Sequence, residues 1–301
     1  MKTTMNDKFR ERISRMVDDQ KAFFEVIENN MPYAFRVNTL KAERKQVLER
    51  FGKYGIACKQ LPFCKDGFVT DDLRVGSTME HFMGHVYIQE VVSMIPPLMI
   101  DLGRVILDAC AAPGSKTTQL AALMENKGVL IANDIDYNRI KALNSNIERL
   151  GVLNTTVMNM NLMRMDGEFD SILLDAPCSA EGTIRKNWDT LSHWSEKLVI
   201  SNSSRQKLLI LKAYDMLKEG GNLVYSTCTF GPEENEEVID HLLEKRDGVT
   251  LEKVSVKGFR TSEGVGEWGK KTYDFDIKKV ARIWPHHNNT GGFFVAKVTK
   301  G

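Results

Sequence analysis

The 301-residue sequence predicts an α/β fold in which a doubly wound, mostly parallel sheet follows a small N-terminal α+β unit. From Arg104 onward, short apolar runs alternate with segments of helical periodicity. Each run is almost continuously apolar, which is typical of parallel strands covered by helices on both faces. Residues 1–100 lack this alternation. We therefore expect a small domain over residues 1–85 and a larger domain over residues 86–301.

The larger domain is predicted to contain six strands separated by helices. The helix after the second strand has apolar residues three or four positions apart over 140–150 and ends at Gly151. Another amphipathic helix is expected at 206–217. The last strand, 291–300, is expected to be an antiparallel edge strand. The predicted strands are 104–109, 128–133, 154–158, 169–176, 222–227 and 291–300.

The N-terminal unit is predicted to begin with one charged amphipathic helix at about residues 6–28. A second helix, at about 42–54, follows the segment "FRVNTL" (35–40). Basic residues gather around this second helix, and they form either a solvated helix face or a patch that faces RNA. They are Lys41, Arg44, Lys45, Arg50, Lys53 and Lys59. The short strands expected in this unit lie near 56–63, 67–70 and 86–89.

The composition is that of an ordinary globular protein. With 41 Lys and Arg against 40 Asp and Glu, the net charge neither indicates nor excludes a nucleic-acid partner. We find no signal peptide and no long uncharged apolar span, so we expect a cytoplasmic protein with no membrane partner. The five cysteines form no CxxC pair, so we expect neither a disulfide framework nor a metal site. Cys58 and Cys64 are expected to be core residues.

Polar residues follow the carboxyl ends of the predicted strands, which is where ligands bind in doubly wound sheets. The turn after the first strand has neither the P-loop spacing nor the G-x-G-x-x-G fingerprint, which argues against a ligand with a phosphate chain. Asp134 follows the second strand, at the position of a ribose-binding carboxylate. This combination favours a nucleoside cofactor such as S-adenosylmethionine. The alternative is that Asp134 only caps the next helix.

Two cysteines stand just past the ends of separate strands. Cys178 follows the fourth strand and Cys228 the fifth. If these strands are neighbours, both sulfur atoms reach one pocket. A thiolate is a strong nucleophile at neutral pH, and a nearby cation such as Lys116 raises the ionised fraction of a thiol.

Several segments of the chain resemble the successive motifs of the NOL/NOP/Sun (Fmu) family of RNA cytosine C5-methyltransferases. The segments are "DACAAPGSKT" (108–117), "NDID" (133–136), "DAPCSAEGT" (175–183), "YSTCTFGPEENEEVI" (225–239), "FRVNTL" (35–40), "YIQEVVSMIP" (87–96) and "RIWPHHNNTGGFF" (282–294). The resemblance implies a Rossmann-like class I methyltransferase sheet and an N-terminal domain similar to an RNA-recognition fold. It also implies S-adenosylmethionine as cofactor and RNA as substrate.

The resemblance further implies a role for each residue of the catalytic set. Cys228 would add to carbon 6 of cytosine, so that carbon 5 accepts the methyl group, and Cys178 would help to release the enzyme afterwards. Asp175 would act at ring nitrogen 3 in a protonated form favoured by its apolar strand. Lys116 would organise the base and this carboxyl group.

The resemblance also places the cofactor. Asp134 would bind the ribose, with Arg139 nearby. Asn161 stands where the family usually carries an aspartate for the adenine amino group, and its amide oxygen can accept the same hydrogen bond. Asp175 would share the rim around the adenine. The residues expected around the methionine part are Ala111, Ala112, Pro113, Gly114, Ser115 and Lys116.

The reacting cytosine has to be unstacked to reach a cysteine, so the expected substrate is single-stranded RNA or a flipped nucleotide. Transfer RNA is favoured, ribosomal RNA is the alternative, and the enzyme is expected to be a monomer. A non-catalytic RNA-binding assembly factor is a second hypothesis, and a nucleotide hydrolase a third that the missing P-loop opposes. Six residues are expected either to contact RNA at the mouth of the site or to be surface and packing residues: Arg185, Lys186, Trp188, Trp284, His286 and His287.

Overall fold

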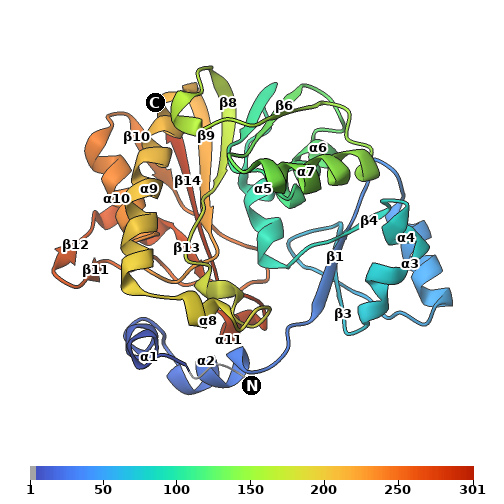
Figure 1. Cartoon of the computed structure of the whole chain (residues 1–301), viewed down its shortest axis with the longest axis horizontal. Coiled ribbons are helices and arrows are strands. Elements are labelled where there is room, and N and C mark those ends of the chain that lie inside the picture. Colours follow the sequence, from blue (N-terminus) through green and yellow to red (C-terminus); the bar gives the residue numbers. More distant parts are fainter. Residues whose placement is uncertain (1–4) are drawn as a thin grey trace.

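A large mixed sheet forms the centre of the protein, seen here in a computed structural model that describes residues 5–301 (Figure 1). Its strand order is β10-β14-β9-β8-β5-β6-β7, with β13 paired to β14. The strands β5 to β9 are parallel, and β14 is antiparallel to β9. The strands are β5 (Val105–Asp108), β6 (Val129–Asn133), β7 (Thr155–Met158), β8 (Phe169–Asp175), β9 (Leu217–Thr227), β10 (Val249–Glu252), β13 (Ala281–Ile283) and β14 (Phe293–Lys300).

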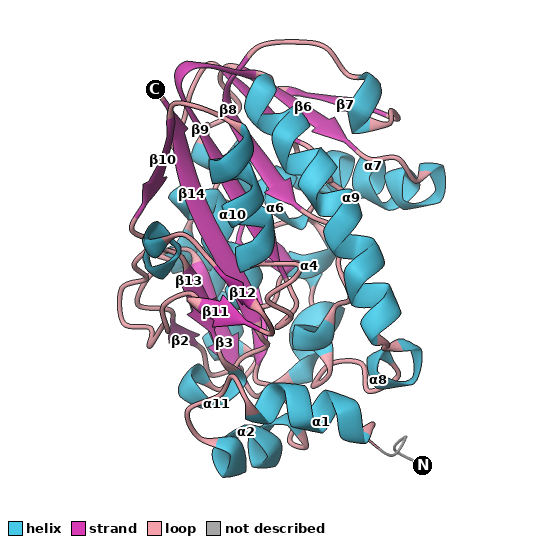
Figure 2. Cartoon of the chain, turned by 90° about the vertical axis from the view of Figure 1, so that its left-hand side faces the viewer, coloured by secondary structure: helices cyan, strands magenta, loops and turns pink. Residues whose placement is uncertain are grey.

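Helices cover both faces of this sheet, as the predicted doubly wound fold requires (Figure 2). Successive strand residues point to opposite faces. Ile106 is buried on the face that α5 and α6 cover, whereas Leu107 is buried on the face that α9 and α10 cover. The helices of this domain are α5 (Ile95–Met99), α6 (Ser115–Leu123), α7 (Tyr137–Leu150), α8 (Thr190–His193), α9 (Glu196–Asp215), α10 (Glu236–Lys245) and α11 (Pro285–Asn288). Short 3-10 turns lie at 92–94, 162–164, 181–183 and 275–279, and β11 (Glu267–Trp268) pairs with β12 (Lys271–Thr272).

The last strand differs from the prediction in its position. β14 is antiparallel, as expected, but it is not an edge strand. Its outer side pairs with β13 near its start and with β10 near its end. The two added strands have only three and four residues, too few to produce a recognisable apolar pattern.

The small unit is a four-stranded antiparallel sheet of order β2-β3-β1-β4, with α3 on one face. This order of strands and helices matches the expected similarity to an RNA-recognition fold. Its opposite face lies against the larger domain. There the buried Arg36 donates hydrogen bonds to Gln89 Oε1 and Thr118 Oγ1, both at 3.1 Å. The elements are β1 (Tyr33–Val37), α3 (Arg44–Lys53), β2 (Lys59–Gln60), β3 (Gly67–Thr70), a 3-10 turn (Leu73–Ser77), α4 (Met79–Phe82) and β4 (Val86–Ile88).

The single helix predicted for residues 6–28 is wrong, since two helices, α1 (Asp7–Ser14) and α2 (Gln20–Ile27), stand there. The helical segment is interrupted before Asp19, whose side chain caps α2 by accepting a hydrogen bond from the amide of Ala22 at 2.9 Å. Both helices pack below the large sheet, where Phe23 contacts Phe230 and Trp284 (Figure 1). The first residues therefore pack on the larger domain and not on the small sheet. Among residues 5–301, no helix has the length and apolarity needed to cross a membrane.

Candidate active site

Two cavities meet at the carboxyl ends of β5, β8 and β9. The first has a volume of about 360 Å³ and the second about 700 Å³. Four residues line both cavities: Cys110, Arg139, Asp175 and Cys228. Reactants held in the two cavities would therefore meet at the carboxyl group and the thiol that the sequence singled out.

The two predicted thiols converge. Because β8 and β9 are neighbours, Asp175 lies opposite Ser226, and the loops that follow carry Cys178 and Cys228 together. Their sulfur atoms are 3.5 Å apart. The contact with Cys228 and burial both raise the pKa of the Cys178 thiol. The contact with Cys228 and burial thus favour the protonated thiol of Cys178, and either sulfur can be the donor in this contact.

Asp175 and Lys116 form an ion pair at the shared wall of the cavities. Lys116 Nζ lies 2.5 Å from Asp175 Oδ2, and the Ser226 hydroxyl donates to Oδ1 at 2.8 Å. Burial acts to lower the pKa of Lys116, but the charge and hydrogen bond of Asp175, together with the charge of Asp108, outweigh burial and raise this pKa. Both oxygens of Asp175 have a polar partner, Oδ2 in Lys116 and Oδ1 in Ser226. The expected protonated form of Asp175 stays a prediction.

Buried carboxyl groups that the sequence analysis did not select hold the two cysteine loops. Glu234 accepts hydrogen bonds from the amide of Ser179 at 3.0 Å and from Gln206 Nε2 at 2.9 Å. Glu181 accepts one from the amide of Phe230 at 2.8 Å. Burial raises the pKa of Glu234 to about 7. The acidic run "GPEENEE" after Cys228 was a signal for this role, since it follows directly on a catalytic strand end.

Asp108 is another buried carboxyl group at the site. It lines the first cavity and accepts a hydrogen bond from the Thr117 hydroxyl at 2.7 Å. Its other oxygen has no hydrogen-bond partner within residues 5–301. Burial raises the pKa of Asp108 to about 7.

The expected cofactor residues divide between the two cavities. Asp134, Arg139, Asn161 and Asp175 line the second cavity. Ala111, Ala112, Pro113, Ser115 and Lys116 line the first. Gly114 lines neither, but its φ of +101° makes the turn into α6, and a Cβ there would lie 2.9 Å from a methyl carbon of Leu143.

Asp134 is not a helix cap, which removes the alternative interpretation. The cap of α7 is Asp136, whose side chain accepts from the amides of Asn138 and Arg139. Asp134 instead accepts from the amide of Ala112 at 3.1 Å and lies 3.5 Å from Arg139 Nη1. The second cavity contains the carboxylate of Asp134 and the side-chain amide of Asn161 but no phosphate-binding loop. These polar groups fit the hydrogen-bonding groups of a nucleoside.

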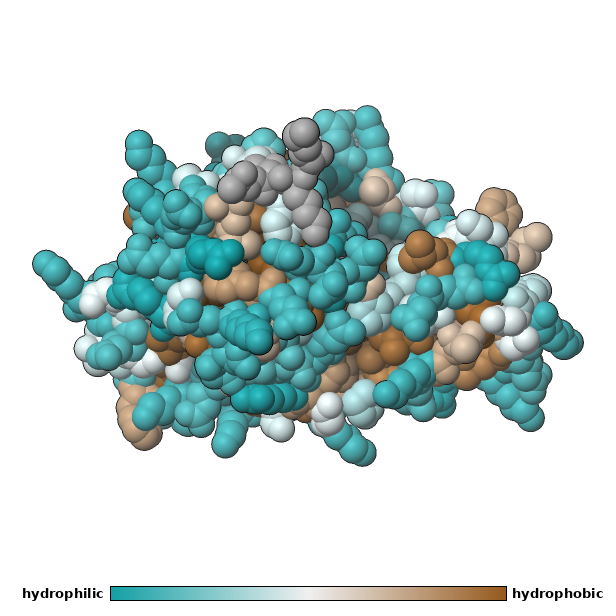
Figure 3. All heavy atoms as spheres, turned by 90° about the horizontal axis from the view of Figure 1, so that it is seen from below, coloured by the Kyte–Doolittle hydropathy of each residue, from teal (hydrophilic) through white to brown (hydrophobic). Residues whose placement is uncertain are grey.

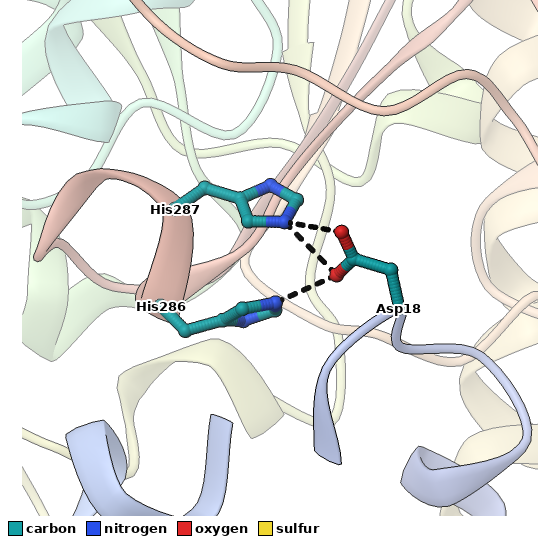
Figure 4. A group of neighbouring side chains, drawn as sticks. All are labelled: Asp18, His286 and His287. Carbon is teal, nitrogen blue, oxygen red and sulfur yellow. Dashed lines mark hydrogen bonds and ion pairs between the residues drawn. The ribbon is translucent and has the colours of Figure 1, made fainter. Parts of the chain in front are cut away.

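Most of the residues expected to contact RNA have structural partners instead. Trp284 is 3% exposed and stacks on Phe230, with ring centroids 5.1 Å apart. His286 and His287 direct their Nε2 atoms to Asp18 Oδ1, at 2.8 and 2.9 Å (Figure 4). Asp18, the partner of both histidines, lies in the segment between α1 and α2. Phe230, the partner of Trp284, lies in a loop that contacts Phe23 of α2.

Two of these six residues remain at or near the surface. Lys186 is exposed and lines the first cavity, and its ammonium has no ion pair or hydrogen bond within the described chain. Trp188 is half-buried against the cluster that contains α1 and α2. Arg185 binds four acceptors, described below.

The basic residues of the small unit are partly paired. Arg44 lies 3.2 Å from Asp66 and Arg50 lies 3.6 Å from Glu80. Figure 3 shows the lower face of the molecule as mainly hydrophilic, with apolar atoms between the polar ones. The face of the small sheet that packs on α6 is not available to RNA, so any RNA contact of this unit uses its helices, loops or edge.

Sequence models of known families match nearly the whole chain. The model of 16S rRNA methyltransferase RsmB/F matches residues 98–299, and that of the N-terminal domain of 16S rRNA methyltransferase RsmF matches residues 5–91. The chain belongs to the RsmB/F family. The RsmB/F assignment confirms the resemblance to the NOL/NOP/Sun (Fmu) group, and the chain is a methyltransferase.

Two similar proteins differ in their length and in their named substrates. The tRNA (cytosine(49)-C(5))-methyltransferase of Pyrococcus abyssi is 42% identical, over 98% of this RsmB/F chain and 96% of its own. Ribosomal RNA small subunit methyltransferase F of Vibrio atlanticus is 40% identical over 94% of this chain. This chain spans only 60% of the length of that relative.

Solved structures share the whole arrangement. A methyltransferase homolog protein from Pyrococcus horikoshii superposes with a TM-score of 0.84 at 36% identity, covering 94% of this chain and 91% of that one. NSun6 from the same organism, solved with SFG, has a TM-score of 0.83 at 25% identity and 97% coverage of both chains. The Rossmann-like methyltransferase fold is therefore confirmed.

Proposed function

We propose that this RsmB/F protein transfers a methyl group from S-adenosylmethionine to carbon 5 of a cytosine in RNA, with tRNA as substrate. One observation carries the proposal. The sulfur atoms of Cys178 and Cys228 are 3.5 Å apart where two cavities meet, and the paired Lys116 and Asp175 line the same place. We further propose that the enzyme acts as a monomer in the cytoplasm.

Cys228 is the proposed nucleophile. Its sulfur forms a bond to carbon 6 of the cytosine, and the electron pair of the 5,6 double bond moves to make carbon 5 nucleophilic. After carbon 5 has gained the methyl group, its proton passes to a base at the site and the electron pair of that carbon–hydrogen bond restores the 5,6 double bond. The sulfur–carbon bond breaks at the same time, and its electron pair stays on the sulfur of Cys228. The position of Cys228 supports this assignment, because Cys228 lines both cavities whereas Cys178, whose sulfur lies 3.5 Å away, lines only the second. Cys178 is then placed to assist the release step.

Asp175 and Lys116 are proposed to act at the ring nitrogen 3 and its surroundings, where negative charge develops. Asp175 accepts hydrogen bonds from Lys116 and Ser226, and it is proposed to donate a proton to nitrogen 3 when the base is bound. The ammonium of Lys116, 2.5 Å away, is the neighbouring proton source. Lys116 and Asp175 are therefore proposed to form an ion pair in the free enzyme. When the base is bound, a proton passes from Lys116 to Asp175.

S-adenosylmethionine is proposed as the cofactor, and when bound it supplies a methyl group made electrophilic by its sulfonium centre. The residues present fit such a molecule. Asp134 would hold the ribose and Asn161 the adenine in the second cavity, while the turn at 111–116 lines the first. Arg139 and Asp175 line both cavities, so a cofactor that extends from one cavity into the other would pass between or beside them.

The lengths of the similar proteins favour transfer RNA as the substrate. The P. abyssi protein named for cytosine 49 of tRNA matches this chain over almost the full length of both proteins. The relatives named for ribosomal RNA are the basis for 16S rRNA as a second candidate, but they extend well beyond the matched part. A flipped or single-stranded cytosine is required in either case.

The test is incorporation of methyl groups from labelled S-adenosylmethionine into tRNA and 16S rRNA, with bisulfite sequencing to locate the product. The wild-type protein should methylate tRNA, Cys228→Ala should be inactive, and Cys178→Ala should accumulate a denaturation-resistant protein–RNA adduct. Cys58→Ala is the matched control, since Cys58 is partly buried against the core of the small unit, away from both cavities. An adduct with Cys228→Ala and none with Cys178→Ala would reverse the two roles. No transfer to either RNA would refute the proposal.

A further inference from the structure

Arg185 joins three segments that are far apart in the sequence. Its guanidinium donates hydrogen bonds to the carbonyl oxygens of Asn29 and Asn30, at 3.1 and 2.8 Å. It also donates to the Thr290 carbonyl at 2.9 Å and to Asn289 Oδ1 at 2.7 Å. The fixed fork of an arginine can serve several acceptors at once, which a lysine cannot do.

Each of the joined segments forms a wall of the first cavity. Met31 follows directly on Asn30, Gly291 and Gly292 follow on Thr290, and Thr183 precedes Arg185, and all four of these wall residues line the cavity. Lys116, Asp175 and Cys228 line it too. We propose that Arg185 is a positioning residue that assembles the pocket for the target cytosine from these three segments. This inference rests on the proposed function, since the pocket is assigned to the base by that reaction.

Two of the three walls are also in direct backbone contact. The amide of Gly292 donates to the carbonyl of Gly182 at 2.9 Å, and a Cβ on Gly182 would lie 2.2 Å from the carbonyl oxygen of Gly292. Glu90 accepts from the amide of Gly291 at 3.1 Å. The N-terminal wall with Met31 makes neither of these two contacts, and Arg185 joins its end to the others through the carbonyls of Asn29 and Asn30.

A second clamp keeps the N-terminal helices docked independently of Arg185. Asp18 binds His286 and His287 and lies 2.6 Å from Arg260 Nη2 (Figure 4). Removal of the Arg185 guanidinium should therefore shift the end of the segment near Met31 without detaching α1 and α2. A shift of about 1 Å at a reactive site is enough to lower the rate about 100-fold.

The alternative role for Arg185 is a direct contact with an RNA phosphate, and salt dependence separates the two. A residue that binds a phosphate contributes about one to the slope of log affinity against log salt concentration. Lys186 has an exposed and unpaired ammonium at the mouth of the same cavity, so Lys186→Ala should reduce this slope by about one. Arg185→Ala should leave the slope unchanged, because its guanidinium is already occupied.

The experiment compares Arg185→Ala, Arg185→Lys and the control Arg246→Ala. Arg246 also binds through several hydrogen bonds, to Asp215 and the carbonyl of Lys245, but these lie away from both cavities. Arg185→Ala should lower kcat/KM for tRNA about 100-fold. Arg185→Lys should lower it less, and Arg246→Ala should have no effect. The dissociation constant of S-adenosylmethionine, measured by calorimetry, should stay within about twofold of wild type in all three, since Arg185 bonds none of the residues expected to hold the cofactor.

Hydrogen exchange gives a readout that does not depend on activity. In Arg185→Ala the amides of Met31, Gly291 and Gly292 should exchange faster, while amides in β5 and β8 should keep their protection. The proposal is overturned if kcat/KM for tRNA stays within about threefold of wild type, if the salt slope falls by about one, or if protection is lost throughout the sheet. If the wild-type protein methylates no RNA, the proposed function fails, but the exchange result still decides whether Arg185 positions these walls.

Discussion

Replacement of Glu234 by glutamine should make the stability of the protein less sensitive to pH. Glu234 is fully buried below the loop that carries Cys178. Burial raises its pKa from 4.5 to about 7, so the folded protein binds more protons than the unfolded chain between these pH values. The free energy of unfolding therefore falls as the pH rises through this window. Glutamine resembles the protonated carboxyl group and does not titrate.

The size of the effect follows from the two pKa values. At about 1.4 kcal/mol per tenfold change in acidity, ionisation of Glu234 costs the folded state about 3.4 kcal/mol once the pH is well above 7. About 0.8 kcal/mol of this cost is already present at pH 5. The stability of Glu234→Gln relative to wild type should thus rise by about 2.5 kcal/mol between pH 5 and pH 8.

Urea unfolding of both proteins at pH 5, 6, 7 and 8 measures this difference. Asp108 titrates in the same direction, but it is present in both proteins and cancels in the comparison. Glu244→Gln is the matched control, because Glu244 is exposed on the same stretch of chain and should give a difference that does not change with pH. A flat difference for Glu234→Gln would refute the reasoning, since it would mean that the buried carboxyl group does not titrate between these values.

Three further changes test other parts of the structure. Glu236→Ala leaves the buried guanidinium of Arg282 without its partner, and urea unfolding should show a loss of about 3–5 kcal/mol; a loss below about 1 kcal/mol would contradict this. Gly182→Ala places a Cβ 2.2 Å from the backbone of Gly292, so both the melting temperature and the rate of RNA methylation should fall. Gly220→Ala is the control, because its Cβ would have no atom within 4 Å, and it should leave the methylation rate unchanged. Asp134→Ala should weaken S-adenosylmethionine binding by about 10-fold or more in calorimetry, since it removes the carboxylate that lines the second cavity; unchanged affinity would exclude Asp134 as a ligand.

The parts of the site that follow from strand order could be predicted from the sequence. Parallel strands end at one edge of the sheet, so residues directly after neighbouring strands have to converge. Cys178, Cys228 and Asp175 satisfied this condition, and the structure brings them together. The distinction between Asp134 and Asp136 was not predictable, because both follow the same strand and only the local backbone decides which one caps α7.

Long-range polar contacts could not be predicted in the same way. Glu234 and Glu181 follow strand ends, but their burial was not predictable, because it arises only when two loops 50 residues apart pack against each other. For Arg185, His286 and His287 the sequence left RNA contact and surface or packing roles open, because each has a partner within the first 30 residues of the chain. No local pattern encodes a pairing over more than 150 positions, so such contacts need the assembled fold.

The catalytic pocket does not follow the division between the two matched family regions. The N-terminal region contributes Met31 and Glu90 to the first cavity, and the methyltransferase region contributes Lys116 and Cys228. At the same time, one face of the small sheet is closed by Arg36 and Gln89 against α6, so it cannot bind bases as the exposed sheet of an RNA-recognition domain does. In the proposed function, the N-terminal region therefore completes the walls around the base through Met31 and Glu90, which a detachable binding module would not do. Under that proposal, a methyltransferase region alone would keep the thiol pair and the cofactor cavity but lose one wall of the pocket for the cytosine.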